Sequence, residues 1–130
     1  MADYLLDSDV LIDILKGSQA VISVVRSLPP ESAKCFSTIS EAELWAGVLA
    51  GAPDDAKMLT ELLSALRPIQ VTRAIAQVAG EYRSRYGRSH GTSLPDALIA
   101  ASAKVEGLHL MTRHVRHFPM EDIRLVNPTV

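Results

Sequence analysis

The chain has 130 residues, of which 48% are hydrophobic and 22% are charged, and its formal net charge is −2. These values are typical of one globular domain over residues 1–130 and exclude a disordered chain. The small charge provides no general attraction to nucleic acid, so polyanion binding must depend on local basic clusters. No charge-free stretch approaches the roughly 18 apolar residues that span a bilayer, and the start lacks a basic secretion signal. We therefore expect a cytoplasmic protein with no membrane partner.

The N-terminal half opens with a short apolar run that predicts a strand at residues 4–6. Apolar residues at helical spacing then predict a helix at 10–16, which ends before a glycine, and a second at 20–28, which ends before two prolines. The β-branched and aromatic residues of 35–39 predict a buried strand. Ser40 follows and opens the third predicted helix.

The C-terminal half continues the alternation of apolar runs and helical patterns. In chain order it predicts a helix at 54–66, a strand at 69–71, a helix from 72 to about 86, a loop at 87–93, a helix from 95 to about 107, and strands at 108–112 and 123–126. Strands that alternate with helices favour parallel pairing. We therefore expect an α/β fold with a mostly parallel central sheet of about five strands, covered by helices on both faces.

Acidic residues stand near the starts of three predicted helices. They are Asp7 and Asp9 after the first strand, Glu43 in the first turn of the third helix, and Asp96 in the first turn of the sixth. In open parallel sheets, ligands bind outside the carboxyl ends of the strands, so we expect these carboxylates to gather at one edge. They would repel one another unless a cation neutralised them, and oxygen ligands suit Mg²⁺ or Mn²⁺.

Each acid also has an explanation in local structure. Glu43 would complete a capping box that begins at Ser40. Asp96 is favoured near a helix N-terminus by the macrodipole, and Asp7 and Asp9 are common turn and cap residues. The four residues taken together favour a metal site, because a helix start can serve both purposes.

Four segments of the chain resemble blocks of the PIN-domain ribonucleases, in particular the VapC toxins of toxin–antitoxin pairs. They are YLLDSDVLID at 4–13, SEAEL at 40–44, LPDALIAA at 94–101 and LMTRHVRHF at 110–118. These segments resemble the family's opening, its second and third acidic segments and its C-terminal block. The four occur in the family's order and span nearly the whole chain.

The resemblance implies a single PIN-like domain and a Mg²⁺- or Mn²⁺-dependent endoribonuclease, the toxin of a type II pair. By that analogy Asp7, Glu43 and Asp96 are the metal ligands and catalytic residues, with Glu43 either a ligand or the general base that orients the attacking water. The resemblance also implies a VapB-like antitoxin whose C-terminal segment covers the acidic pocket.

The sequence departs from the family at His114, where the family often has an acid or an asparagine. His114 could be a ligand of a second metal or a phosphate contact, or one ion could suffice, and Asp9 could supply the missing carboxylate. Ser8 and Thr112 could hydrogen-bond the acids or a phosphate. For both, simple turn and strand-end hydrogen bonding is the plainer explanation.

Basic residues flank the third acidic segment on both sides. The set comprises Arg83, Arg85, Arg88 and His90 before it, and Arg113, His114, Arg116 and His117 after the strand that returns to the same edge. We expect the five arginines to contact RNA phosphates, which would make binding depend on salt. A solvated face with routine ion pairs to Glu81 or Glu106 is the alternative.

Two other function classes fit parts of the sequence. Asp7-Ser8-Asp9 also resembles the Asp-x-Asp strand end of haloacid dehalogenase-type phosphatases, but the chain has no matching lysine motif and no room for a cap domain. A non-catalytic binding module with the same fold would act only through antitoxin or dimer contacts. The apolar helices around 45–49 and 58–66 carry more hydrophobic residues than a small core needs, so we expect a homodimer and an antitoxin groove. Cys35 is expected to be a buried, inert thiol.

Overall fold

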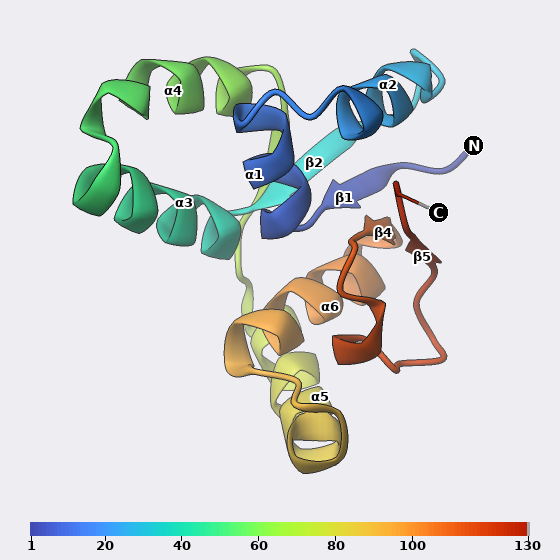
Figure 1. Ribbon diagram of the computed structural model, residues 1–130. Helices are drawn as coiled ribbons and strands as arrows, with labels where there is room; N and C mark the ends of the chain where they lie inside the picture. The colour runs from blue at the N-terminus through green and yellow to red at the C-terminus, as the bar shows by residue number, and fades with distance from the viewer. Residues whose placement is uncertain (130) are drawn as a thin grey trace.

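Figure 1 shows the computed structural model of the protein, which describes residues 1–129. Within them, five strands form one sheet in the order β3-β2-β1-β4-β5, and every neighbouring pair is parallel. The strands are β1 (Tyr4–Leu6), β2 (Lys34–Ser37), β3 (Arg67–Ile69), β4 (His109–Met111) and β5 (Leu125–Val126). The predicted α/β fold with a parallel sheet is confirmed.

Helices connect the strands throughout the described residues. The α-helices are α1 (Ser8–Leu15), α2 (Gln19–Ser27), α3 (Thr38–Gly51), α4 (Ala56–Ser64), α5 (Arg73–His90) and α6 (Leu94–Glu106). Two short 3-10 helices, η1 (Pro53–Asp55) and η2 (Val115–His117), precede α4 and follow β4. Among residues 1–129, no helix is long and apolar enough to cross a membrane.

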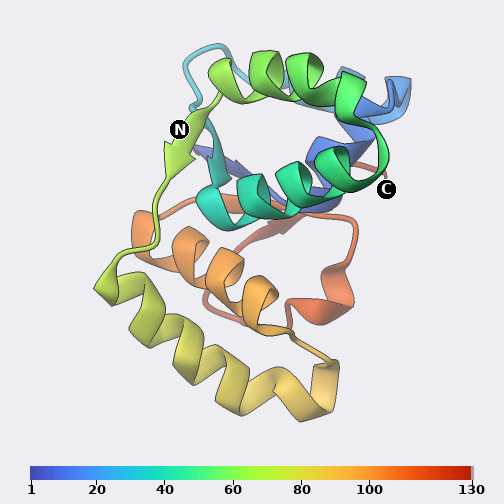
Figure 2. The same cartoon turned by 90° about the vertical axis from the view of Figure 1, so that its left-hand side faces the viewer.

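The sheet separates two apolar cores, because successive side chains of a strand point to opposite faces. Leu5 and Cys35 pack with α5 and α6, whereas Leu6, one residue further along β1, packs with the helices α1 to α4. Figures 1 and 2 show α5 and α6, in yellow and orange, on one side of the sheet and the blue to green helices on the other. Cys35 is fully buried, and burial raises the pKa of its thiol, as expected of an inert cysteine. The carboxyl edge of the sheet is left to polar residues.

Helix α3 begins before its predicted start. Its cap is Ser37, whose hydroxyl accepts a hydrogen bond from the Ile39 amide at 3.1 Å. The predicted capping box of Ser40 and Glu43 is therefore wrong, because β2 ends early enough for an upstream serine to cap the helix. Ser40 lies inside the first turn with none of its surface exposed, and Glu43 lies in the second turn. Helix α1 likewise starts at Ser8 rather than at residue 10, with Asp7 as its cap.

Pro68, between α4 and α5, lies inside a strand, whereas the strand predicted at 69–71 would begin after it. β3 covers Arg67–Ile69 rather than 69–71, and Pro68 is paired in register with Phe36 of β2. β3 is an edge strand, so the side of Pro68 that lacks an N–H group needs no partner there.

Helix α5 continues through residues 87–90, where a loop was predicted. Gly87 is helical, and the Arg83 guanidinium folds across it into space that a β-carbon would occupy. The helix ends at Gly91, whose φ of +64° is the left-handed conformation that stops helices. The predicted basic loop is thus mostly the last turn of a helix.

Candidate active site

Asp7 lies at the carboxyl end of β1 and is held by two neighbouring segments. Its Oδ1 accepts a hydrogen bond from the Ser8 amide at 2.7 Å, and its Oδ2 accepts one from the Thr112 hydroxyl at 2.8 Å. Thr112 follows β4, so this bond joins residues 105 positions apart. Only 4% of Asp7 is exposed. The parallel pairing of β1 with β4 therefore fixes this carboxylate.

Burial and neighbouring charge raise the pKa of Asp7 from its ordinary 3.8 to about 7. The largest cause is the removal of the carboxylate from water, followed by the negative charge of Asp9, with a smaller contribution from Asp96. The hydrogen bonds from Thr112 and Ser8 act in the opposite direction and do not cancel these effects. Asp9 and Asp96 therefore lie close enough for their charges to act on Asp7.

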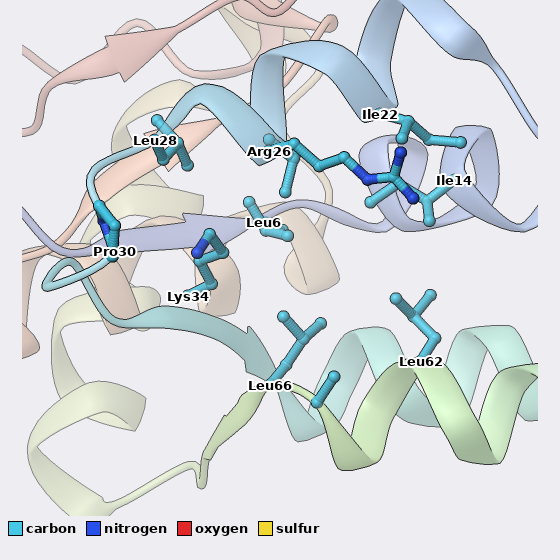
Figure 3. Close-up of a pocket in the computed structure, with 11 residues that line it drawn as sticks. Leu6, Ile14, Ile22, Arg26, Leu28, Pro30, Lys34, Leu62 and Leu66 are labelled. Atoms are coloured by element: carbon cyan, nitrogen blue, oxygen red, sulfur yellow. The ribbon is translucent and has the colours of Figure 1, made fainter.

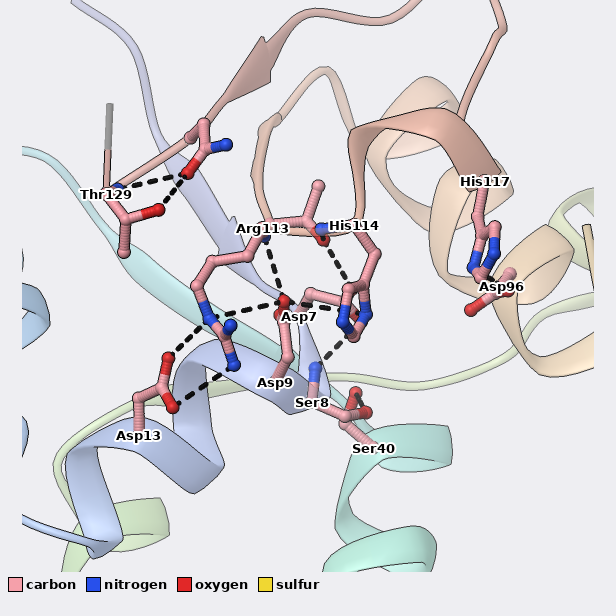
Figure 4. A network of polar contacts seen from close by, with 12 residues as sticks. Asp7, Ser8, Asp9, Asp13, Ser40, Asp96, Arg113, His114, His117 and Thr129 are labelled. Carbon is pink, nitrogen blue, oxygen red and sulfur yellow. Dashed lines mark hydrogen bonds and ion pairs between the residues drawn. The ribbon is translucent and has the colours of Figure 1, made fainter.

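Asp9, in the first turn of α1, is also buried, with 7% exposed. Its Oδ2 accepts a hydrogen bond from the Arg113 amide at 2.9 Å and lies 3.7 Å from Nδ1 of His114 (Figure 4). Its Oδ1 is buried and has no hydrogen-bond partner within residues 1–129. A buried carboxylate oxygen without a donor is unfavourable, and a cation beside it would remove the penalty.

Glu43 is exposed on α3 and is tied to the same centre through Ser8. The Ser8 hydroxyl donates to Glu43 Oε1 at 2.9 Å, while the Ser8 amide donates to Asp7. The structure thus links Asp7 and Glu43, which are 36 positions apart in sequence, through one serine. The predicted supporting role of Ser8 and of Thr112 corresponds to the hydrogen bonds that both make to the acids.

Asp96 stands in the first turn of α6 and forms a capping box with Ser93. The Ser93 hydroxyl accepts a hydrogen bond from the Asp96 amide at 3.1 Å, and Asp96 Oδ2 accepts one from the Ser93 amide at 3.4 Å. The side chain is 24% exposed, and Nδ1 of His117 lies 3.6 Å from its Oδ2. The local structure of the helix start therefore accounts for Asp96, through a capping box that was not predicted, and its charge still reaches Asp7.

The segment after β4 packs against the acids through Arg113 and two histidines. Nε of Arg113 lies 2.7 Å from Asp13 Oδ2, and its Nη2 donates to Asp13 Oδ1 at 3.3 Å, so this guanidinium is already paired. The rings of His114 and His117, with centroids 5.9 Å apart, lie beside Asp9 and Asp96 (Figure 4). Sequence reasoning missed Asp13, although its position one helical turn after Asp9 places both on one face of α1.

The other predicted RNA-binding residues are exposed. Arg83, Arg85 and Arg88 lie on α5, and Arg116 lies on η2. In the described part of the chain, none of these four arginines forms an ion pair, so the alternative pairs with acids on α5 and α6 are not formed. The last turn of α5 leads through a short connection to the cap of α6, which carries Asp96.

The chemistry of the acidic edge fits a divalent cation, although the side chains are not arranged as a finished ligand set. Among residues 1–129, no three His, Cys, Asp or Glu side chains are placed to hold one ion. Two observations favour a cation: the raised pKa of Asp7 and the buried Asp9 oxygen without a donor. Glu43 and Asp96 are accessible to solvent, so an ion can reach both carboxylates without disturbing the core.

A cleft of about 600 Å³ lies between α1, α2 and the end of α4 (Figure 3). Its walls are mainly apolar and include Ile14, Val25 and Leu62, with Arg26 and Lys34 as the basic members. The cleft uses part of the predicted 58–66 region but also α2, which the sequence had not indicated. Trp45, from the other predicted region, is half-buried and donates to Glu41 at 3.1 Å.

Residues 4–117 match the PIN domain family. Ribonuclease VapC10 of Mycobacterium tuberculosis is 39% identical over 117 residues, which cover 89% of this chain and 86% of that protein. Ribonuclease VapC19 of the same organism is 35% identical over 118 residues, which cover 89% and 92%. A solved toxin–antitoxin complex from Klebsiella pneumoniae contains a chain with a TM-score of 0.80 and 25% identity, covering 97% of this chain and 98% of that one.

These matches agree with the four sequence blocks and with the parallel sheet. They favour the PIN-domain family over the haloacid dehalogenase-type phosphatase. The family match covers most of the chain, including Asp7, Glu43 and Asp96. The chain belongs to the PIN-domain family, in the branch that contains the VapC ribonucleases.

Proposed function

We propose that this protein is a Mg²⁺- or Mn²⁺-dependent endoribonuclease and the toxin of a type II toxin–antitoxin pair. The observation that carries the proposal is the buried Asp7, whose pKa rises to about 7 beside Asp9 and Asp96. A carboxylate in such surroundings is ionised at neutral pH only at a cost, which a bound cation removes. The names of the two VapC relatives support RNA as the substrate.

In the proposed mechanism, Asp7 and Asp96 would hold the cation, and Glu43 would either join them or accept a proton from the attacking water. When bound, a divalent cation neutralises charge at the phosphorus and lowers the pKa of that water. Thr112 donates to Asp7 Oδ2, which fixes the plane of the carboxylate. Asp9 and His114 lie next to each other and are the candidates for a further ligand position.

The exposed arginines provide the counter-charge that an acidic pocket needs in order to admit RNA. We assign Arg83, Arg85, Arg88 and Arg116 to phosphate contacts, which would make RNA binding fall as salt rises. Arg113 belongs to the same predicted set, but its pairing with Asp13 suits it to holding the segment after β4. RNA as a substrate is consistent with a cytoplasmic protein.

The proposed regulator is a VapB-like antitoxin whose C-terminal segment covers the acidic pocket. The Klebsiella pneumoniae structure is a toxin–antitoxin complex, which supports a partner of this kind. The apolar cleft between α1, α2 and α4 offers such a partner a second contact. Leu49 and Met58 are exposed by 65% and 50%, which supports the proposed homodimer.

The test is cleavage of a mixed RNA pool by purified, antitoxin-free protein with Mg²⁺ or Mn²⁺. Asp7→Asn and Asp96→Asn should each abolish cleavage, as should EDTA. Asp54→Asn is the matched control, because Asp54 is an exposed aspartate on η1, and it should cleave like the wild type. Cleavage that survives both active-site variants and EDTA would contradict the proposal.

A non-catalytic binding module is the second candidate, and one observation favours it. Within residues 1–129 the acids do not form a finished ligand set, and His114 stands where the family often has an acid or an asparagine. Wild-type protein that binds its antitoxin but cleaves no RNA with either metal would favour this candidate.

A further inference from the structure

Within residues 1–129, Ser8 is the one residue that donates hydrogen bonds to the side chains of both Asp7 and Glu43. Its amide donates to Asp7 Oδ1 at 2.7 Å, and its hydroxyl lies 2.9 Å from Glu43 Oε1. Ser8 is the first residue of α1, and Glu43 lies on α3, so the hydroxyl of Ser8 links two separate helices, while its amide bonds to the cap of its own helix. The serine hydroxyl therefore bears on the orientation of the Glu43 carboxylate, while Asp7 is held by backbone and by Thr112.

A third hydroxyl determines the direction of these hydrogen bonds. Oγ of Ser40 lies 2.8 Å from Oγ of Ser8. A hydroxyl has one proton to donate, and an ionised carboxylate only accepts. Ser8 must therefore donate to Glu43, which leaves Ser40 to donate to Ser8. The three groups form a chain of hydrogen bonds in which each donor strengthens the next.

The burial of these groups differs along the chain of hydrogen bonds. Ser40 is fully buried, Ser8 is half-buried and Glu43 is exposed. An exposed glutamate samples several rotamers, and fixing one of them has an entropic cost. Ser40 lies one helical turn before Glu43 on α3, so the buried end of the chain is anchored in the same helix that carries the acid.

We propose that Ser8, backed by Ser40, is a positioning residue that holds the Glu43 carboxylate beside Asp7 in the orientation needed for phosphodiester cleavage. The inference rests on the proposed nuclease function. It accounts for why Ser40 is buried in the first turn of α3 without capping that helix.

The experiment is a double-mutant cycle between Ser8→Ala and Glu43→Gln, measured as kcat and KM for RNA at saturating Mn²⁺. If Ser8 acts through Glu43, Ser8→Ala should lower kcat about tenfold with little change in KM, and it should have no further effect in the Glu43→Gln background. Ser8→Thr keeps the hydroxyl and should restore most of the activity. Ser40→Ala should lower kcat by a smaller factor, about threefold.

Thermal unfolding and a matched variant distinguish the proposed positioning role of Ser8 from a purely structural role. Ser102→Ala also removes a hydroxyl from a buried serine that bonds only within its own helix, and it should leave kcat unchanged. Losses for Ser8→Ala and Glu43→Gln that multiply in the double variant would overturn the inference while leaving the nuclease in place. Unchanged kcat in Ser8→Ala would do the same. Wild-type protein that cleaves no RNA would overturn the proposed function and this inference together.

Discussion

Asp7 and Asp96 both stand at the start of a helix, yet different parts of the chain hold them. Asp7 is fixed by Thr112, which is 105 positions away, and is almost fully buried. Asp96 is fixed by Ser93, three positions away, and remains partly exposed. The first carboxylate is therefore positioned by the tertiary structure at a cost in ionisation, whereas the second is positioned by local capping. One side of the site is rigid and the other can adjust.

The sharpest test of this comparison is Asp7→Asn, which should destroy activity and stabilise the fold. Asparagine keeps an oxygen that accepts from the Ser8 amide and removes the buried negative charge. We expect the free energy of unfolding at pH 8 to rise by roughly 2–4 kcal/mol, since three pKa units correspond to about 4 kcal/mol. Asp96→Asn should instead leave stability within about 1 kcal/mol of the wild type, because an asparagine at a helix start also accepts hydrogen bonds.

The pH dependence of the unfolding free energy shows whether the stabilisation by Asp7→Asn comes from the ionisation of Asp7. The pKa of Asp7 is 3.8 in its ordinary state and about 7 in the fold, so between these values the folded chain keeps a proton that the unfolded chain has lost. The contribution of Asp7 to the free energy of unfolding is complete below pH 3.8 and decreases as the pH rises to about 7. The difference in unfolding free energy between Asp7→Asn and wild type should therefore grow over this interval. A constant difference would show that the pKa of Asp7 is not raised.

Much of this arrangement could be predicted from the sequence because it depends on local chemistry. The strand at residues 4–6 ends in an acid, and Ser93 precedes Asp96 by the spacing of a capping box. The bond from Thr112 to Asp7 also follows once both are recognised as ends of neighbouring parallel strands. These signals involve either short spacing or the rule that parallel strands share an edge.

The remaining features could not be predicted, because they depend on alternatives between which the local sequence does not decide. Ser37 and Ser40 are both acceptable caps, and the length of β2 decides between them. The burial of Asp9 Oδ1, and the pairing of Asp13 with Arg113, depend on where the segment after β4 packs. The cleft between α1, α2 and α4 arises from three helices that are separate in sequence.

Thr112→Val tests the rigid side of the site, around Asp7, and should change the stability less than Asp7→Asn does. The substitution keeps the shape of the side chain but removes the only hydroxyl that donates to Asp7 Oδ2 in the described residues. We expect a loss of about 1–3 kcal/mol in unfolding free energy, as for other buried groups left without a partner. The pKa of Asp7 should rise further, because this hydrogen bond lowers it. Thr112→Ser, which keeps the hydroxyl, should recover most of the stability in chemical denaturation.

Ser93→Ala tests the locally capped side and should have a smaller effect. It removes the N-cap hydroxyl of α6, which typically costs about 1 kcal/mol. Cleavage activity should fall only a few-fold, because Asp96 keeps its backbone position. Ser18→Ala removes the N-cap of α2 and is the matched control, with a similar stability loss and normal activity. A loss of activity as large as that of Asp96→Asn would mean that the capping box fixes Asp96 more firmly than the comparison implies.

Asp13→Asn should have the smallest effect, since it breaks an ion pair that is partly open to solvent. The Arg113 and Asp13 side chains are 37% and 18% exposed, and such pairs contribute on the order of 0.5–1 kcal/mol. Chemical denaturation at low and high salt should show that most of this contribution disappears as salt rises, because screening weakens exposed pairs more than buried ones. A loss above about 2 kcal/mol, unaffected by salt, would mean that the segment after β4 needs Arg113 to hold His114 beside Asp9. In that case the rigid side of the site would extend beyond Asp7 to the whole segment.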